Sequence, residues 1–328
     1  MIVRALGLLA VVPFLIGAAS QSGPTGRHAV TIQDRQITEA SALVALPGGL
    51  FATSNDSGDT GRVFVLDRTG ATVGVTHWSA DPTDVEALAP AGDGQVWVGD
   101  IGDNAASRTT IQVAEVPVGR GERTVTPPIY SLAYPDGAHD AETLLCDPAD
   151  GRLYVATKGI LGGTLYAAPA HLVAGATNRL TAVGRVLPIA TDGTFWPDGR
   201  FVLIRNYFAA TVYAWPSLEP QATFQLPNQP QGEGIGVTAG GRVYLSSEGL
   251  HSTVIADPLP ADVEKVLVPA EKALPPGPRQ LSAGTTAHSA RTTTDSTGGG
   301  WWPWALGGLA GLAVIGVLLL ALRPTGRA

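Results

Sequence analysis

Acidic or hydroxyl side chains that begin short hydrophobic segments are the feature of this sequence with the clearest chemistry. Such starts recur with steps of 45, 56, 50 and 41 residues, at Ser41, Glu86, Glu142, Asp192 and Glu233. A second residue, polar in every case, stands two positions away: Glu39, Asp84, Asp140, Thr194 and Gln231. Because residues two apart on a strand point to the same side, each pair is expected to face one way together.

Carboxylates gathered at one place repel each other unless some keep a proton or a cation neutralises them. Oxygen ligands without cysteine or clustered histidine select hard cations, and many converging protein oxygens favour Ca²⁺ over Mg²⁺. We therefore predict a Ca²⁺ site at these positions. Its ligands are Ser41, Glu86, Glu142, Thr194 and Glu233, with Asp192 as the alternative to Thr194. The competing interpretation is that these side chains only cap strand starts and bond backbone amides in turns.

A second set of polar residues, mostly in expected loops, is predicted to bind a small polar ligand. The set consists of Asn55, Asp56, Asp59, Asp100, Asp103, Asn104, Asp140, Lys158, Arg205 and Glu248. Loops on a rigid scaffold commonly carry binding sites. The two acidic loops lack the glutamate that an EF-hand has at its twelfth position, because Asp67 and Ile111 stand there. Lys158 and Arg205 suit a phosphate or carboxylate group, whereas the alternative role for them is an ion pair that orders the rim.

The elements that must position these residues follow one pattern that occurs five times between residues 28 and 273. Each copy has a short apolar strand, a DG or GG turn, and two or three further alternating strands, as in DGRLYVATK and DGRFVLIRN. Repeats of this length match four-stranded propeller blades. We predict an all-β fold, a β-propeller of five blades, with six blades as the alternative and a β-sandwich as a weaker one. The segment HAVTIQD (28–34) would complete the last blade, and EKVLVPA (264–270) is also expected to form an outer strand.

Composition excludes several classes of partner and site. The formal net charge of −7 argues against a nucleic-acid partner. The single cysteine, Cys146, excludes an intrachain disulfide, and no cysteine–histidine cluster suits structural zinc.

Both terminal regions carry targeting signals. Residues 1–20 are predicted to be a secretory signal peptide, with an uncleaved anchor as the alternative. Residues 274–300, rich in Thr, Ser, Gly and Pro, are predicted to be a disordered stalk. Residues 301–323 are predicted to be a transmembrane helix, since tryptophans precede an uncharged stretch and Arg323 follows it, with 324–328 as a cytoplasmic tail. The expected location is the cell membrane, single-pass, with the large N-terminal domain outside the cytoplasm.

Four motifs together resemble a largely uncharacterised family of exported bacterial β-propellers. They are NDSGD (55–59), DVEALA (84–89), GDIGDN (99–104) and DAETLL (140–145). The likeness spans roughly residues 35–250 and implies a propeller fold and an exported location. In its pattern alone, the chain is also similar to calcium-activated apyrases, five-bladed propellers with a central Ca²⁺ held by one residue per blade. That similarity implies a metal ring at Ser41, Glu86, Glu142, Thr194 and Glu233, without implying nucleotidase activity.

Three functions fit these observations. The first is a membrane-anchored propeller that binds a small polar ligand at its acidic mouth, with Ca²⁺ present. The second is a metal-dependent hydrolase of phosphorylated or sugar-like substrates, in which Glu86, Glu142 or Asp140 would surround a metal-bound water. The third is a scaffold for another envelope protein. The fold alone does not choose among them.

Overall fold

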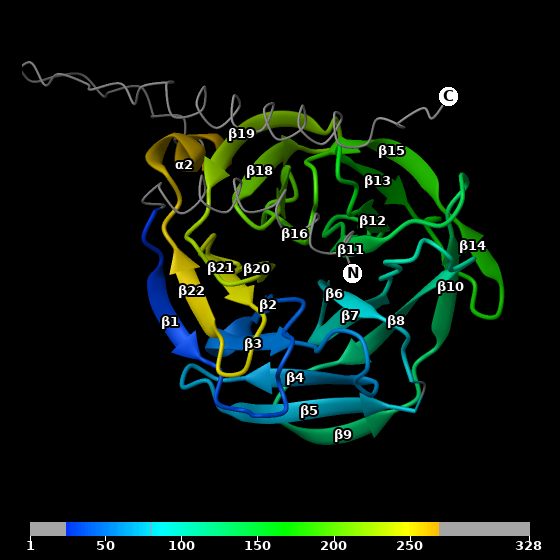
Figure 1. Ribbon diagram of the computed structural model, residues 1–328, viewed down its shortest axis with the longest axis horizontal. Coiled ribbons are helices and arrows are strands. Elements are labelled where there is room, and N and C mark those ends of the chain that lie inside the picture. Colours follow the sequence, from blue (N-terminus) through cyan, green and yellow to red (C-terminus); the bar gives the residue numbers. More distant parts are fainter. Residues whose placement is uncertain (1–23, 80, 269–328) are drawn as a thin grey trace, which may run out of the picture. The chain divides into compact units, whose positions relative to one another are not determined.

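The computed structural model describes residues 24–79 and 81–268, which form five β-sheets arranged around a central axis (Figure 1). The innermost strands are β2 (Val44–Leu46), β6 (Val85–Gly92), β11 (Ala141–Cys146), β16 (Asp192–Phe195) and β20 (Gly232–Val237). The second strands are β3 (Leu50–Thr53), β7 (Gln95–Asp100), β12 (Leu153–Thr157), β17 (Phe201–Arg205) and β21 (Val243–Ser247). The third strands are β4 (Arg62–Leu66), β8 (Ile111–Pro117), β13 (Gly163–Ala167), β18 (Ala209–Ala214) and β22 (Thr253–Asp257). The prediction of a five-bladed β-propeller is confirmed.

The fourth strand of the last blade comes from the start of the described chain. In the first four blades the outer strands are β5 (Thr72–Trp78), β10 (Ile129–Ala133), β15 (Thr181–Val186) and β19 (Glu219–Gln225). In the fifth blade β1 (Arg27–Thr31) pairs antiparallel with β22. This pairing closes the ring as predicted from HAVTIQD.

The predicted outer strand at residues 264–270 is wrong. Residues Ala261–Leu267 form the short helix α2, which buries Val263 and Leu267 and leaves Glu264 and Lys265 exposed. Buried residues four apart lie on one side of a helix. A strand at this place would also have no free edge to pair with, because β1 already occupies the outer edge of the blade.

Two further strands, β9 (Gly121–Val125) and β14 (Thr177–Arg179), add parallel edges to the first and second blades. Each comes from the connection between the third and fourth strands of the following blade, β8 to β10 for β9 and β13 to β15 for β14.

Tight turns and alternating side chains explain why these segments form blades. In the β6–β7 hairpin, Asp93 and Gly94 both have positive φ, at 46° and 74°, as a two-residue type I′ turn requires.

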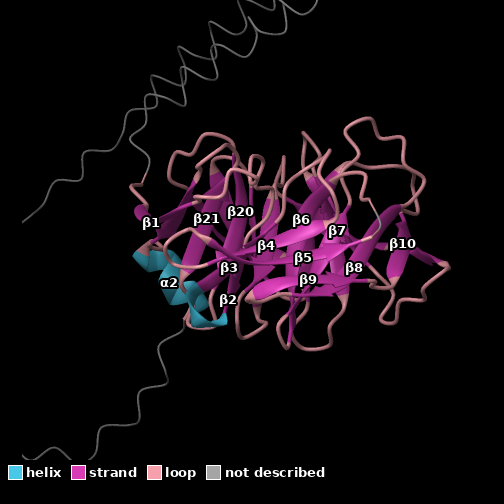
Figure 2. Ribbon diagram, turned by 90° about the horizontal axis from the view of Figure 1, so that it is seen from below, coloured by secondary structure: helices cyan, strands magenta, loops and turns pink. Residues whose placement is uncertain are grey.

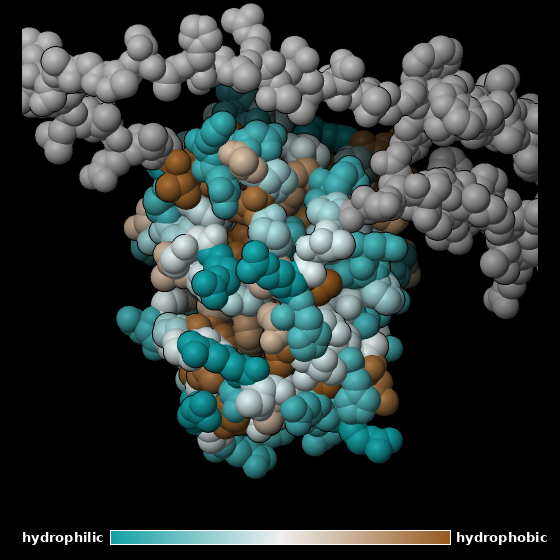
Figure 3. All heavy atoms as spheres, turned by 90° about the vertical axis from the view of Figure 1, so that its left-hand side faces the viewer, coloured by the Kyte–Doolittle hydropathy of each residue, from teal (hydrophilic) through white to brown (hydrophobic). Residues whose placement is uncertain are grey.

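Seen from the side, the strands run between two rims of loops (Figure 2). The hydrophobic core lies mainly between neighbouring blades, as where Tyr154 and Leu165 of the third blade pack with Val202 and Tyr213 of the fourth. On the outer face around β1, β22 and α2, hydrophilic and hydrophobic side chains are interspersed (Figure 3).

The ring is narrow, so that neighbouring inner strands touch. Gly234 and Gly236 of β20 face residues of the first blade, and a Cβ on Gly234 would lie 2.7 Å from the Leu43 Cβ and 2.8 Å from its backbone nitrogen. A Cβ on Gly236 would lie 3.0 Å from the backbone nitrogen of Ala45. Glycine is therefore required where the last blade meets the first.

The predicted signal peptide, stalk, transmembrane helix and cytoplasmic tail lie outside the described residues. Within residues 24–79 and 81–268, no helix combines the length and hydrophobicity needed to cross a membrane.

Candidate functional site

Three of the five sequence-predicted metal ligands occupy equivalent irregularities at one end of the ring. Glu86, Glu142 and Glu233 each lie where the pairing of an inner strand with its second strand shifts register. A β-bulge re-aims the side chain of the extra residue. The same device in three blades therefore presents three carboxylates at the mouth where the inner strands begin.

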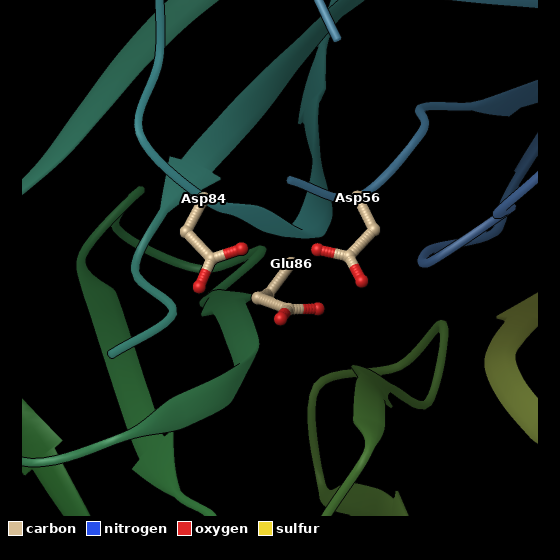
Figure 4. Close-up of side chains that lie close together, drawn as sticks. All are labelled: Asp56, Asp84 and Glu86. Carbon is tan, nitrogen blue, oxygen red and sulfur yellow. The ribbon is translucent and has the colours of Figure 1, made fainter. Parts of the chain in front are cut away.

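A tight cluster of carboxylates forms around Glu86. Oxygen atoms of Asp56, Asp84 and Glu86 all lie within 4.8 Å of one another. The three side chains point toward one another from different elements (Figure 4): Asp56 from the loop after β3, Asp84 from the residue before β6, and Glu86 from β6 itself. Ser41 adds a fourth oxygen, because its hydroxyl donates to Glu86 Oε2 at 2.7 Å.

Burial and mutual repulsion change the protonation of this cluster. Burial, together with the charges of Glu142 and Asp56, raises the pKa of Glu86 to about 10. Burial also raises the pKa of Asp84 to about 7, with the adjacent Asp56 carboxylate adding to the effect. Asp84 Oδ1 has no hydrogen-bond partner among the described residues, although the side chain is only 9% exposed. Without a cation, Glu86 therefore holds a proton at neutral pH.

In the adjacent third blade, Lys158, which directly follows β12, supplies a positive charge at the mouth. Its ammonium pairs with Glu142 Oε1 and lies 5.5 Å from the ring centroid of Tyr207. Burial lowers the pKa of Lys158, but the charge and hydrogen bond of Glu142 outweigh burial and leave that pKa above its ordinary value. Burial raises the pKa of Glu142 to about 7 in spite of Lys158, and Glu142 Oε2 has no hydrogen-bond partner in the described part of the chain.

Glu233 and Glu248 complete the acidic mouth. Burial raises the pKa of Glu233 to about 8, and the charge of Glu142 contributes to the rise. Burial raises the pKa of Glu248 to about 7, with Asp56 adding to it. These influences show that the two sides of the mouth act on each other electrostatically.

Most of the other predicted ligand-binding residues are engaged in holding loops. The side-chain oxygen of Asn55 accepts the backbone N–H of Thr38 at 3.1 Å, and its side-chain N–H donates to the carboxylate of Asp59 at 2.8 Å. Asp59 also pairs with Arg62 at 2.8 Å. These contacts of Asn55 and Asp59 match the alternative interpretation, in which acidic and amide side chains hold turns in place instead of binding a ligand.

The GDIGDN loop is built in the same way. Asp100 accepts the amide of Asp84 at 2.9 Å and pairs with Arg108 at 2.8 Å. Asp103 accepts the amide of Arg108 at 2.7 Å, and its own amide donates to Asp140 Oδ1 at 2.8 Å. The remaining member of the predicted set in this loop, Asn104, is exposed. The loop thus fixes the backbone that carries Asp84.

The fourth blade departs from the others. Thr194 lies among the residues that line a cavity at the opposite end of the inner strands, and its hydroxyl bonds the Phe195 carbonyl at 3.4 Å. The hydroxyl of Thr191 instead donates to the carbonyl of Glu233 at 3.1 Å, as that of Ser41 does to the carbonyl of Glu86 at 3.3 Å. Asp192 accepts the Ile235 amide at 2.8 Å, and burial raises its pKa well above the ordinary value.

Arg205 lies inside the protein rather than on the rim. Its side chain is 0% exposed and donates to Gln229 at 3.2 Å and to the Gly234 carbonyl at 3.1 Å. Burial lowers its pKa to about 10, against the opposing charges of Glu233 and Asp192. Arg205 therefore balances buried carboxylates behind the mouth.

Sequence reasoning did not assign roles to Arg108, Thr191 or Asp257. Burial raises the pKa of Asp257 to about 6, with Arg205 opposing the rise. The role of Arg108 could have been suspected from the sequence, because this cation follows the acidic GDIGD motif by five residues. The roles of Thr191 and Asp257 depend on contacts between distant segments.

No protein-family model and no curated protein matches this chain. Among solved structures, a glucose dehydrogenase is similar, with a TM-score of 0.44 and 10% sequence identity over 72% of this chain and 100% of that chain.

Proposed function

We propose that this chain is a Ca²⁺-binding propeller whose acidic mouth binds a small polar ligand. The observation that carries the proposal is the convergence of Asp56, Asp84 and Glu86. One buried oxygen of this cluster, Asp84 Oδ1, has no hydrogen-bond partner in residues 24–79 and 81–268. Three carboxylates and a hydroxyl form an oxygen-only donor set, which suits a hard cation. A dication would replace the proton that Glu86 otherwise needs.

Ca²⁺ is favoured over Mg²⁺ by the variety of the donors. The oxygens come from a loop, from a strand start and from Ser41, and such irregular surroundings suit the flexible coordination of Ca²⁺ better than the strict octahedron of Mg²⁺. The Lys158 ammonium, which pairs with Glu142 of the third blade, would together with the bound cation attract an oxyanion of the ligand.

The location proposed with this function is the outer side of a membrane. The support is the sequence outside the described residues, with its N-terminal apolar segment and the tryptophan-flanked uncharged stretch at 301–323.

Thermal unfolding of the full chain tests the cation. A hundredfold excess of Ca²⁺ over its dissociation constant is expected to stabilise the wild type by about 2.7 kcal/mol, which raises the melting temperature by roughly 5–10 °C. The Asp84→Asn/Glu86→Gln variant should lose this increase, and Mg²⁺ should give a smaller one in the wild type.

Asp147→Asn is the matched control, because this carboxylate is also buried but accepts the Trp215 indole N–H at 2.8 Å away from the cluster. The control should keep the full effect of Ca²⁺. Equal Ca²⁺ effects in the control and the double variant, or none in the wild type, would rule out the proposed site.

A further inference from the structure

A cavity of about 1290 Å³ lies where the five inner strands end. Its walls are the turn segments 45–51, 89–92, 144–148, 193–197 and 237–240, with residues of β1 and the β4–β5 turn. Glu86, Glu142 and Glu233 stand at the opposite ends of the same strands. The cavity is therefore a separate feature from the acidic mouth.

Positive charge gathers on the side of the cavity that the fifth and first blades form. Arg27, His28, Arg68 and Arg242 line it. None of the three arginines forms a salt bridge with a carboxylate among the described residues. In a chain with a net charge of −7, this concentration of unpaired guanidinium groups is opposite in sign to the whole.

The one carboxylate among the lining residues, Asp147, is already occupied. It accepts the indole N–H of Trp215 and the backbone amide of Ala149, both at 2.8 Å. It does not reach any of the three arginines as an ion-pair partner. The arginines consequently keep their hydrogen-bonding capacity for a ligand.

The backbone and the aromatic rings nearby hold two of these arginines. Gly49 has φ +77°, and a Cβ there would lie 2.1 Å from Arg68 Nε, so the guanidinium lies against the bare backbone of this turn. Arg242 has its Nη1 3.5 Å from the hydroxyl of Tyr244, whose ring packs edge-on against Phe51 with centroids 4.9 Å apart.

The opposite wall, from the second, third and fourth blades, is largely apolar. It includes Pro90, Leu144, Cys146, Phe195 and Trp196. Ligand sites are typically apolar concavities with a few polar groups that orient the ligand. A cationic wall facing an apolar wall matches a molecule with an anionic group at one end.

We propose that this cavity binds a small organic anion in which a carboxylate, sulfonate or phosphate is attached to an aromatic or aliphatic body. Arg68 and Arg242 hold the anionic group through charge-assisted hydrogen bonds. The body packs against Phe195, Trp196 and Cys146. The site needs no cation, so the test of this cavity is independent of the test of the proposed Ca²⁺ site at the acidic mouth.

The test compares two probes that share one ring system, naphthalene-2-sulfonate and the uncharged 2-naphthalenemethanol, on the full chain. Equilibrium dialysis gives their affinities. The sulfonate is expected to bind at least about tenfold more tightly, the effect of roughly one charge-assisted hydrogen bond. The Arg68→Gln/Arg242→Gln variant should lose that preference. Arg200→Gln is the matched control, because Arg200 is exposed, pairs with Asp198 and does not line the cavity.

Cys146 localises the binding, because it is the single cysteine and lines the apolar wall. The sulfonate should slow maleimide modification of Cys146 in the wild type and in Arg200→Gln, and not in the double arginine variant. Equal affinity for both probes, or an unchanged sulfonate preference in the double variant with its melting temperature intact, would overturn the proposal. Protection of Cys146 by a polyglutamate peptide and not by the sulfonate would replace the small anion with an acidic peptide.

Discussion

At the scale of single residues, Glu86 is where burial and charge oppose ionisation most strongly. Burial and, to a smaller extent, the charges of Glu142 and Asp56 together raise its pKa to about 10. The folded protein thus keeps a proton that the unfolded chain releases near pH 4.5. The stability associated with this proton is complete below that pH and is lost as the pH rises toward about 10.

Without divalent cations, the melting temperature is therefore expected to fall between pH 5 and pH 9. The free energy of unfolding should decrease by an amount of the order of a few kcal/mol, since one pKa unit corresponds to about 1.4 kcal/mol. Glu86→Gln, which mimics the protonated acid and still accepts a bond from Ser41, should flatten this dependence. Unfolding at several pH values in EGTA measures it, with Asp147→Asn as the control that keeps the wild-type slope. The same slope in Glu86→Gln would contradict the assignment of the proton to Glu86.

The residues of the acidic mouth could be predicted from sequence to the extent that strand periodicity governs them. The recurrence of Glu86, Glu142 and Glu233 at strand starts indicated a shared opening, and the Asp84–Glu86 spacing indicated a shared direction. The fourth blade could not be predicted, because the residue that resembles Ser41 in its contact is Thr191 and this contact depends on the neighbouring blade. The burial of Arg205 likewise follows from packing by Gln229 and Gly234, which no local pattern shows.

At the scale of elements, the close approach of inner strands holds the mouth together. Gly234 follows Glu233 directly, and a Cβ at Gly234 would meet the Ser246 Oγ at 2.3 Å as well as the backbone of Leu43. The position of β20 therefore affects the segment of the first blade that carries Ser41.

Gly234→Ala is expected to destabilise the protein by at least about 2 kcal/mol, because overpacking against backbone forces β20 away from the first blade. It should also weaken Ca²⁺ stabilisation, because the Gly234 Cβ presses on Leu43, and this segment carries Ser41, whose hydroxyl belongs to the proposed donor set. Gly240→Ala is the matched control, because the nearest atom to its Cβ would be 4.0 Å away. Melting curves with and without Ca²⁺ measure both effects, and equal stability of the two variants would contradict the tight inner ring.

The strands of each blade were predictable, including β1 as the strand that completes the last one, whereas helix α2 and the added parallel edges β9 and β14 were not. Alternating side chains and DG turns define the first three strands of each blade locally. Residues 261–267 form a helix because Val263 and Leu267 bury one side of it, and the parallel edges β9 and β14 depend on loops folding back onto a preceding blade. Which segment pairs with the outer edge of a sheet depends on which edges are free in the folded protein, and local strand propensity does not reveal this.

At the scale of the whole propeller, the two ends of the ring have opposite chemistry. Inner strands begin at a carboxylate-rich mouth and end at a cavity lined by Arg27, Arg68 and Arg242. One set of short strands positions both, so ring closure affects both ends. That closure depends on β1, which is close to the first blade in sequence but pairs with β22 of the last.

Val30 tests the closure directly. It is 3% exposed, pairs with Val254 of β22, and packs with Phe64 in the core shared by the last and first blades. Val30→Ala is expected to cost about 2 kcal/mol and to lower the melting temperature by roughly 4–8 °C. Hydrogen exchange should show the amides of β22 losing protection while those of β13, in the third blade, keep theirs. His28→Ala, at an exposed position on the same strand, is the control and should leave β22 protected. If β22 kept full protection in Val30→Ala at the reduced stability, β1 would not be what joins the last blade to the ring.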